Sequence, residues 1–175
     1  MAVTTIPTAG IADGAVDTTQ LADDAVTIAK ATGFGKIAQV VQGSKSTQFD
    51  TSSTSFVDTG LSVSITPSST SSKVLLMSST SAIHIATTSN GGETILKFYR
   101  NTTAIGGAYQ IAKSRQDGSY NQEAGGGGTA MYLDSPSSTS AISYKVYIRI
   151  SNGSGGRICQ GGYTDATITA MEVLA

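Results

Sequence analysis

The sequence has little of what builds a disulfide framework or a metal centre. Among its 175 residues there is one cysteine, one histidine and no tryptophan. With Cys159 alone, no intrachain disulfide can form, and Cys159 and His84 together are too few for a metal cluster. We therefore expect no metal and no cofactor, and a fold that depends on packing and on association with other chains.

Charge and long apolar runs are equally scarce. Charged residues make up 13% of the chain and the net charge is -1, so the basic surface that binds phosphate backbones is missing. We expect no nucleic-acid partner. No stretch approaches the roughly 20 apolar residues of a membrane span, and no signal peptide is visible, so we expect no membrane insertion.

What the chain does contain favours strands and turns. It has 20 glycines, many serines and threonines, and little leucine. Apolar and polar residues alternate in Leu61 to Thr66, Tyr144 to Ile150 and Ile168 to Val173, which is typical of half-buried strands. The denser apolar runs Val74 to Met77 and Ile95 to Tyr99 predict central strands covered on both sides.

These runs predict eight or nine strands from Lys36 onward. A strand number of this size suits a mainly β fold, namely an antiparallel two-sheet sandwich of the jelly-roll kind. The motif Pro67 to Ser71 recurs as Pro136 to Ser140. If strands alternate in direction, both turns lie at the end where the domain begins, together with the tight connection at Asn101. The longer loops then gather at the opposite end.

The N-terminal residues repeat themselves. Ile11 to Gln20 is followed directly by the similar Leu21 to Lys30, and Ala2 to Ile6 resembles a fragment of a further copy. A unit this short cannot close a core of its own, so its apolar side chains must be buried against something else, most naturally other copies of the chain. The side chains that we expect to form this attachment and trimer stem are Ile6, Ile11, Val16, Leu21, Val26 and Ile28.

The chain changes character near Gly33. The spacing of apolar residues from Thr18 to Thr32 is close to helical, although the Asp13-Gly14 pair signals a turn. We predict an extended or partly helical stem over residues 1–35, followed by a knob domain over residues 36–175 that assembles as a trimer.

Candidate recognition residues lie in the longer loops. Tyr120, Asn121 and Gln122 combine an aromatic ring with two amides in the longest loop, and Tyr163 lies near a second glycine-rich loop. Tyrosine rings stack on sugar faces, so a surface glycan is a possible ligand of these four residues. Tyr109 and Tyr132 also lie near loops, and ordinary packing accounts for a tyrosine more often than ligand binding does.

No residue pattern indicates catalysis. His84 alternates with apolar residues and has no nucleophile signature near it, so we assign no catalytic residue. The run Gly125 to Gly128 lacks the Gly-Lys-Ser/Thr ending of a phosphate loop and is interpreted as a loop or turn.

Aspartates of the repeat, such as Asp13 and Asp23, would meet around a threefold axis, but a turn-forming and solubilising role is favoured over metal binding. Acidic residues outside the stem are scattered, which argues against a polysaccharide-degrading enzyme.

The tandem pattern from Ile11 to Thr27 resembles repeats found near the N-termini of many bacteriophage fibre proteins. The segments Thr54 to Pro67, Lys97 to Gly107 and Ile168 to Val173 are similar to parts of the same proteins. The resemblance implies a homotrimeric virion protein, made in the host cytoplasm, with an N-terminal attachment segment and a β-rich C-terminal knob.

Two locations on the particle are compatible with this resemblance. A short tail fibre would be attached to tail or baseplate proteins and would bind host-surface glycan through its knob loops. A head fibre or cement protein would instead be anchored on the major capsid protein. The chain has only two full repeats and a fragment, with no long shaft, so a stem of thirty residues spans at most about 100 Å.

Overall fold

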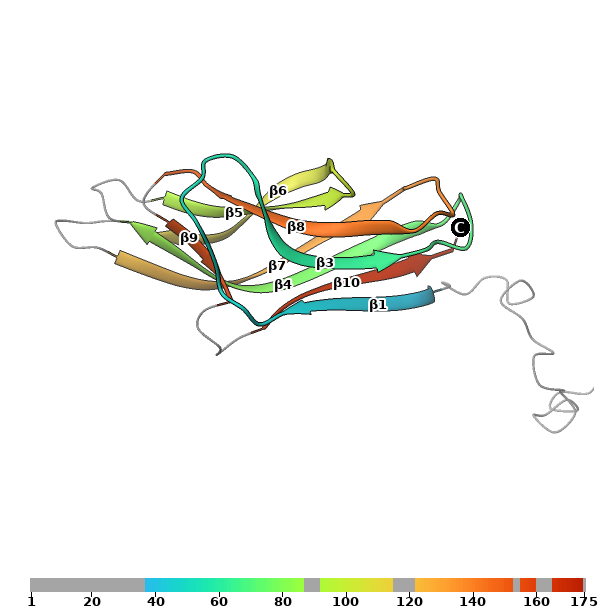
Figure 1. The fold of residues 1–175 in the computed structure, drawn as a ribbon, viewed down its shortest axis with the longest axis horizontal. Coiled ribbons are helices and arrows are strands. Elements are labelled where there is room, and N and C mark those ends of the chain that lie inside the picture. The colour runs from blue at the N-terminus through green and yellow to red at the C-terminus, as the bar shows by residue number, and fades with distance from the viewer. Residues whose placement is uncertain (1–36, 87–91, 115–121, 153–154, 160–164, 175) are drawn as a thin grey trace, which may run out of the picture. The chain divides into compact units, whose positions relative to one another are not determined.

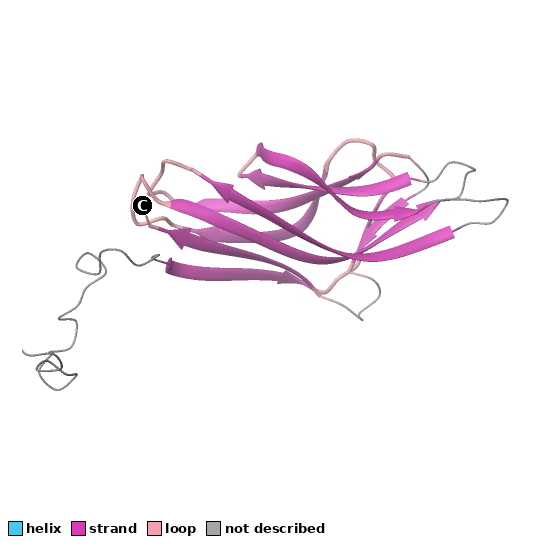
Figure 2. Cartoon of the chain, turned by 180° about the vertical axis from the view of Figure 1, so that it is seen from behind, coloured by secondary structure: helices cyan, strands magenta, loops and turns pink. Residues whose placement is uncertain are grey.

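The computed structural model describes residues 37–86, 92–114, 122–152, 155–159 and 165–174 (Figure 1). The predicted stem lies outside these residues. Every regular element in the described part of the chain is a β-strand (Figure 2). None of the described residues forms a helix long and apolar enough to cross a membrane.

The strands form two antiparallel sheets that pack as a sandwich, as the sequence predicted. The six-stranded sheet contains β1 (Ile37–Lys45), β10 (Ala166–Val173), β4 (Lys73–Ala86), β9 (Gly155–Ile158) and β2 (Phe49–Thr51), with β7 (Gln122–Asp134) paired to β4. The four-stranded sheet contains β3 (Val57–Ile65), β8 (Ile142–Ile150), β5 (Gly92–Arg100) and β6 (Thr103–Ser114), in that order. The described residues contain ten strands, whereas the sequence predicted eight or nine. The difference arises because β2 and β9 are too short to show alternation in the sequence.

The core lies between the sheets and is built by strict alternation. Every second residue of β8, from Ile142 to Ile150, is buried, and β10 and the second half of β3 follow the same pattern. The three alternating segments are therefore confirmed as strands with one buried face. The largest fully buried apolar side chains from the two sheets include Phe98, Leu61, Leu76, Leu96, Ile148 and Ile168.

The denser apolar runs lie in β4 and β5, which are internal strands as predicted. The expectation that both faces are covered is wrong for β4, where Leu75 and Met77 point away from the core and remain partly exposed. It holds in part for β5, where the neighbouring residues Ile95 and Leu96 are both buried while Tyr99 stays partly exposed.

The glycine run Gly125 to Gly128 is not a loop but part of β7. A Cβ atom on Gly128 would lie 2.5 Å from the Ile111 side chain, and one on Gly126 would lie 3.1 Å from the Ile111 carbonyl oxygen. Gly126 and Gly128 thus leave little room for a side chain, because β6 and β7, the edge strands of the two sheets, approach each other closely, whereas a Cβ on Gly125 would meet nothing within 4 Å.

The two ends of the sandwich differ as predicted. Ile37 pairs with Val173, and both Pro-Ser turns lie at that same end, which we call the turn end. The opposite end, which we call the loop end, is where β4 meets β7 at the pair Ala86 and Gln122 and where β5 begins at Gly92. The β4–β5 and β6–β7 connections leave from this end (Figure 1). By contrast, β9 ends at Ile158 opposite Ala82 of β4, and Thr167 of β10 lies opposite Ser79, so the β9–β10 connection leaves from further along β4.

Gly43 provides a test of how tightly the sheets pack. A Cβ atom on Gly43 of β1 would lie 2.9 Å from the carbonyl carbon of Ser62 in β3, whereas one on Gly107 would meet nothing within 4 Å. We predict that Gly43→Ala lowers the free energy of unfolding by about 1–3 kcal/mol, because backbone must shift to admit the methyl group. Gly107→Ala should change it by less than about 0.5 kcal/mol. Urea unfolding of both variants checks this, and equal midpoints would contradict the close contact.

Candidate functional site

Most of the residues that the sequence singled out lie outside the described part of the chain. This holds for the stem positions Ile6, Ile11, Val16, Leu21, Val26 and Ile28, and for the recognition candidates Tyr120, Asn121 and Tyr163. Gln122 is the first residue of β7, so it begins a strand and does not lie in the middle of a loop. Its backbone pairs with Ala86, the last residue of β4, which places it at the loop end.

The loop end is braced by contacts between neighbouring strands. Lys113 of β6 forms an ion pair with Glu93 of β5 at 2.9 Å, and the backbone N–H of Ser151 donates to the Glu93 carbonyl at 2.9 Å. Gly156 of the six-stranded sheet fits against Thr94 and Ile150 of the other sheet, where a Cβ would approach within 3 Å. The strand ends that carry the long connections are thus fixed relative to one another, which is the usual setting of binding loops.

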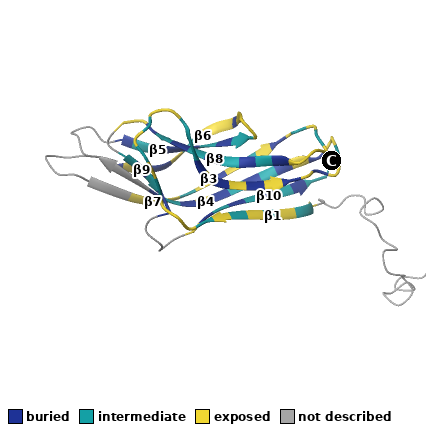
Figure 3. Ribbon diagram, viewed as in Figure 1, coloured by how far each residue is buried: buried dark blue, intermediate teal, exposed yellow. Residues whose placement is uncertain are grey.

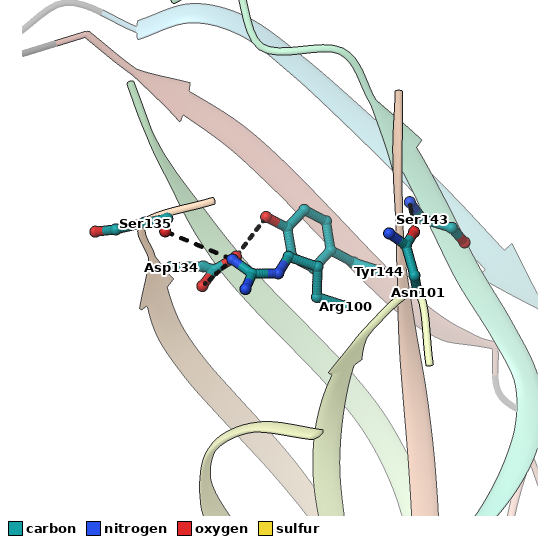
Figure 4. A network of polar contacts seen from close by, with 6 residues as sticks. All are labelled: Arg100, Asn101, Asp134, Ser135, Ser143 and Tyr144. Carbon is teal, nitrogen blue, oxygen red and sulfur yellow. Dashed lines mark hydrogen bonds and ion pairs between the residues drawn. The ribbon is translucent and has the colours of Figure 1, made fainter. Parts of the chain in front are cut away.

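The turn end is held by a buried ionic network (Figure 4). Tyr144, fully buried in β8, donates its hydroxyl to Asp134 Oδ2 at 2.7 Å. Arg100 at the end of β5 approaches the same carboxylate at 3.1 Å. Burial and the hydrogen bond to Asp134 raise the pKa of Tyr144, so this phenol remains protonated and donating. The network joins β5 and β8 of one sheet to β7 of the other.

Asn101 closes the adjacent β5–β6 turn in the same view (Figure 4). Its backbone has a φ of 53°, a left-handed conformation that asparagine tolerates better than most residues. Its side-chain oxygen accepts from the Ser143 N–H at 3.0 Å, and its own N–H donates to the Ser143 carbonyl at 2.7 Å. The sequence indicated the turn but not this partner.

A second carboxylate fixes the first Pro-Ser turn. Glu172 of β10 is fully buried and accepts hydrogen bonds from Gln39 Nε2 at 2.6 Å and from the Ser68 N–H, the Ser68 hydroxyl and the Ser72 hydroxyl, each at 2.7 Å. Burial alone would raise the pKa of Glu172, but these hydrogen bonds outweigh burial and lower it to about 2. The group is therefore an ionised anchor for residues 66–72 and not a proton donor.

The outer face of the four-stranded sheet carries an aromatic and charged surface that the sequence did not reveal. The rings of Tyr99 and Tyr147 stack with centroids 3.8 Å apart, and Lys145 bonds to Asp58 at 2.9 Å beside them. Hydrogen bonding to Asp58 raises the pKa of Lys145. The sequence did not predict this surface because its residues come from three separate strands and meet only through the register of those strands.

Phe56 extends this surface beside the cations of two internal strands. Lys97 Nζ lies 5.9 Å and the Arg149 guanidinium carbon 5.3 Å from the Phe56 ring centroid. Cations over an aromatic face attract the ring electrostatically. The outer face of this sheet is therefore polar and charged, with its opposite charges partly paired within the chain.

The remaining tyrosines near the loops have packing roles. Tyr109 meets Phe98 edge-on with centroids 5.9 Å apart and donates its hydroxyl to the Met131 carbonyl at 2.6 Å. The Tyr132 ring occupies the space that a Cβ on Gly106 would need. Both side chains thus help to join β6 to β7.

The described residues offer no assembled catalytic centre. Cys159 is fully buried, its Sγ lies 3.2 Å from the Lys45 carbonyl oxygen, and burial raises the pKa of its thiol, which disfavours a reactive thiolate. His84 belongs to β4 and its backbone pairs with Ala124 and Gly156. No group of three or more potential metal ligands occurs within the described residues.

No protein-family model matches the chain, and no curated protein matches it either.

The Glu172 anchor predicts an acid-dependent stability. Because the folded-state pKa is lowered to about 2, the carboxylate contributes fully above the unfolded value of 4.5, and its contribution is lost as pH falls from there towards 2. We predict that Glu172→Gln lowers the free energy of unfolding by about 2–3 kcal/mol at pH 7, and that the difference from wild type narrows below pH 4.5.

Glu93→Gln is the matched control for this variant. It removes a carboxylate from the partly exposed ion pair with Lys113, so its effect should stay within about 1 kcal/mol. Urea unfolding of both variants at pH 7 and pH 3 makes the comparison. A Glu172→Gln deficit that is equally large at both pH values would show that the stabilisation does not come from the charge.

Proposed function

We propose that the chain is a structural virion protein of a bacteriophage, namely a short homotrimeric tail fibre attached through its N-terminal stem. In this proposal the knob binds the host-cell surface through the loops that carry Tyr120, Asn121, Gln122 and Tyr163. The observation that carries it is the opposition of the two ends: β1 begins at Ile37 at the turn end, while the β6–β7 connection, which carries Tyr120 and Asn121, leaves from the loop end. A domain that the chain enters at one end and that carries this connection at the other suits a fibre.

The strand order supports a jelly-roll assignment for the knob. The order β1-β10-β4 with β7 beyond β4 faces the order β3-β8-β5-β6. From β3 to β8 the chain changes sheet at each connection except the β5–β6 hairpin, as the two Greek keys of a jelly roll require. Viral capsid and lectin domains use this architecture, so the fold suits either a structural or a glycan-binding role without deciding between them.

The repeat supports the trimer and the attachment role. A repeat of about ten residues cannot close a core of its own. We therefore expect its apolar positions, such as Leu21 and Val26, to be buried against other chains and against tail or baseplate proteins.

No catalytic role is included in the proposal. Asp134 and Glu172, the buried carboxylates of the described residues, are both engaged in holding turns. Both lie at the turn end, away from the loops proposed to meet the host.

The alternative is a capsid decoration protein, a head fibre or cement protein anchored on the shell by the same N-terminal segment. In that role the N-terminal segment would anchor at a threefold position on the shell. Labelling the C-terminus and imaging intact particles separates the two: label at the tail supports the tail fibre, label over the shell supports the decoration protein, and unlabelled particles contradict both.

The attachment role predicts the behaviour of a stem variant. In the full chain, Leu21→Asp with Val26→Asp should reduce the amount of protein in purified particles at least tenfold while leaving the β-sheet circular dichroism of the knob unchanged. The reason is that charge on the apolar positions opposes their burial against other chains. The control is Gln20→Asp with Thr27→Asp, which adds the same charge at polar positions and should be incorporated normally. Normal incorporation of the apolar-position variant would contradict a role of the repeat in attachment.

A further inference from the structure

The exposed apolar side chains of the described residues gather on one sheet. The four large hydrophobic residues with the greatest exposure are Ile37 at 49%, Val40 at 56%, Met131 at 51% and Leu133 at 46%. All four belong to the edge strands β1 and β7 of the six-stranded sheet (Figure 3). Single exposed apolar residues are normal on a protein surface, but a grouping on one face indicates an interaction site.

Strand register connects these residues into a continuous surface. Val40 of β1 lies opposite Met171 of β10, Met171 lies opposite Leu75 of β4, and Leu75 lies opposite Leu133 of β7. Partners in antiparallel strands point to the same side of the sheet, so these four form one apolar row across all four strands.

A second row begins beside the first. Met77 of β4 lies opposite Met131 of β7, one pleat further along the same face. Three of the four methionines of the chain are therefore on this surface. We call it the apolar face, and it consists of Val40, Leu75, Met77, Met131, Leu133 and Met171.

The surroundings of the apolar face are almost free of charge. The other outward positions described on β1, β10, β4 and β7 are serine, threonine, glutamine and glycine, apart from Ile37, Val173 and Lys73. The ion pair of Arg157 with Asp50 lies on β9 and β2, in the half of the sheet nearer the loop end. The outer face of the four-stranded sheet, by contrast, carries the charged surface around Asp58 and Lys145.

The dimensions fit the centre of a protein interface. Four strands about 4.8 Å apart make a row about 15 Å wide, and two rows about 7 Å apart give a patch of a few hundred Å². A stable interface needs about 800 Å² per partner with an apolar centre and a polar rim, which the surrounding serines and threonines would supply.

We infer that the apolar face is where one copy of this chain packs against another, as the interface of the proposed homotrimer, on which this inference rests. Contacts in a cyclic trimer are heterologous, so each face would meet side chains of the next copy around the axis, and a face almost free of charge can do so without electrostatic repulsion. Ile37, which pairs with Val173 beside the apolar face, follows directly on the segment proposed to associate between chains. Association of the stems would therefore tether three domains to one another, which raises the local concentration of one apolar face around another.

The test uses the full chain with two negative charges placed on the apolar face. Val40→Glu with Leu133→Glu changes two exposed side chains, so the fold should remain while association is weakened to what the stem alone provides. Ser62→Glu with Ser64→Glu is the matched control, because both serines are exposed on edge strand β3 of the other sheet. Light scattering over a dilution series should give a mass of about three chains of 17.8 kDa for wild type and control, whereas the Val40/Leu133 variant, with unchanged circular dichroism, should dissociate to single chains at a protein concentration at least tenfold higher than wild type does.

Each result has a defined meaning. A Val40/Leu133 variant that dissociates at the same protein concentration as wild type overturns the assignment of the face but leaves the trimer standing. A wild-type chain with the mass of one copy overturns both the trimer and this inference.

A second measurement covers the case in which the charged variant fails to fold. A photo-cross-linking residue at position 40 of the otherwise unchanged chain, in a mixture of isotopically light and heavy protein, should join light to heavy copies through residues of the apolar face. Cross-links confined to residues 1–36 of the same chain would overturn the inference, because the stem would then cover the face.

Discussion

The two-residue period of the β-strand assigns each side chain of this domain to one face of its sheet, and the rest of the structure depends on that assignment. In β8 it places Tyr144, Val146 and Ile148 in the core and Ser143, Lys145 and Tyr147 outside. In β4 it places Leu76 in the core and Leu75 outside. An apolar residue at an outward position therefore cannot join the core of its own chain, because the strand fixes its side chain on the outer face of the sheet.

The outer faces consequently have different characters. The face of the four-stranded sheet pairs Asp58 with Lys145 and stacks Tyr99 on Tyr147, so its polar groups have partners within the chain. The apolar face of the six-stranded sheet has no such internal partners in the described residues. Since burial of apolar surface is the main driving force of association, the second face suits contact with another protein and the first suits contact with solvent.

The ends of the sandwich are fastened without a disulfide. Two carboxylates from different strands, Glu172 and Asp134, each collect several donors at the turn end. A buried charge is costly unless it is fully hydrogen-bonded, and here the bonds fix the two Pro-Ser turns and the end of β5. The long connections at the opposite end start from strands that are already locked together.

The sequence predicted those features of the fold, namely strands and turns, that are determined by residues close together in the chain. Apolar and polar alternation identified the half-buried strands, and the assumption that successive strands alternate in direction placed both Pro-Ser turns at one end. The strand at Gly125 to Gly128 was missed because the reason for glycine there is the close approach of Ile111, which belongs to a different strand. The donors of Glu172 and the rows of the apolar face are likewise long-range, since Met77, Met131 and Met171 meet only through register. The roles of Tyr120, Asn121 and Tyr163 stay predictions.

Electron cryo-microscopy of the full chain, alone or on the particle, tests most directly whether the outer face of the six-stranded sheet, with Val40 and Leu133, is buried between copies of the chain. The resolution must separate the two sheets. We expect three sandwiches around one axis, with the six-stranded sheets turned towards it and the paired charges of Asp58 and Lys145 facing solvent. Three copies with the four-stranded sheets turned inwards, or isolated single copies, would contradict it.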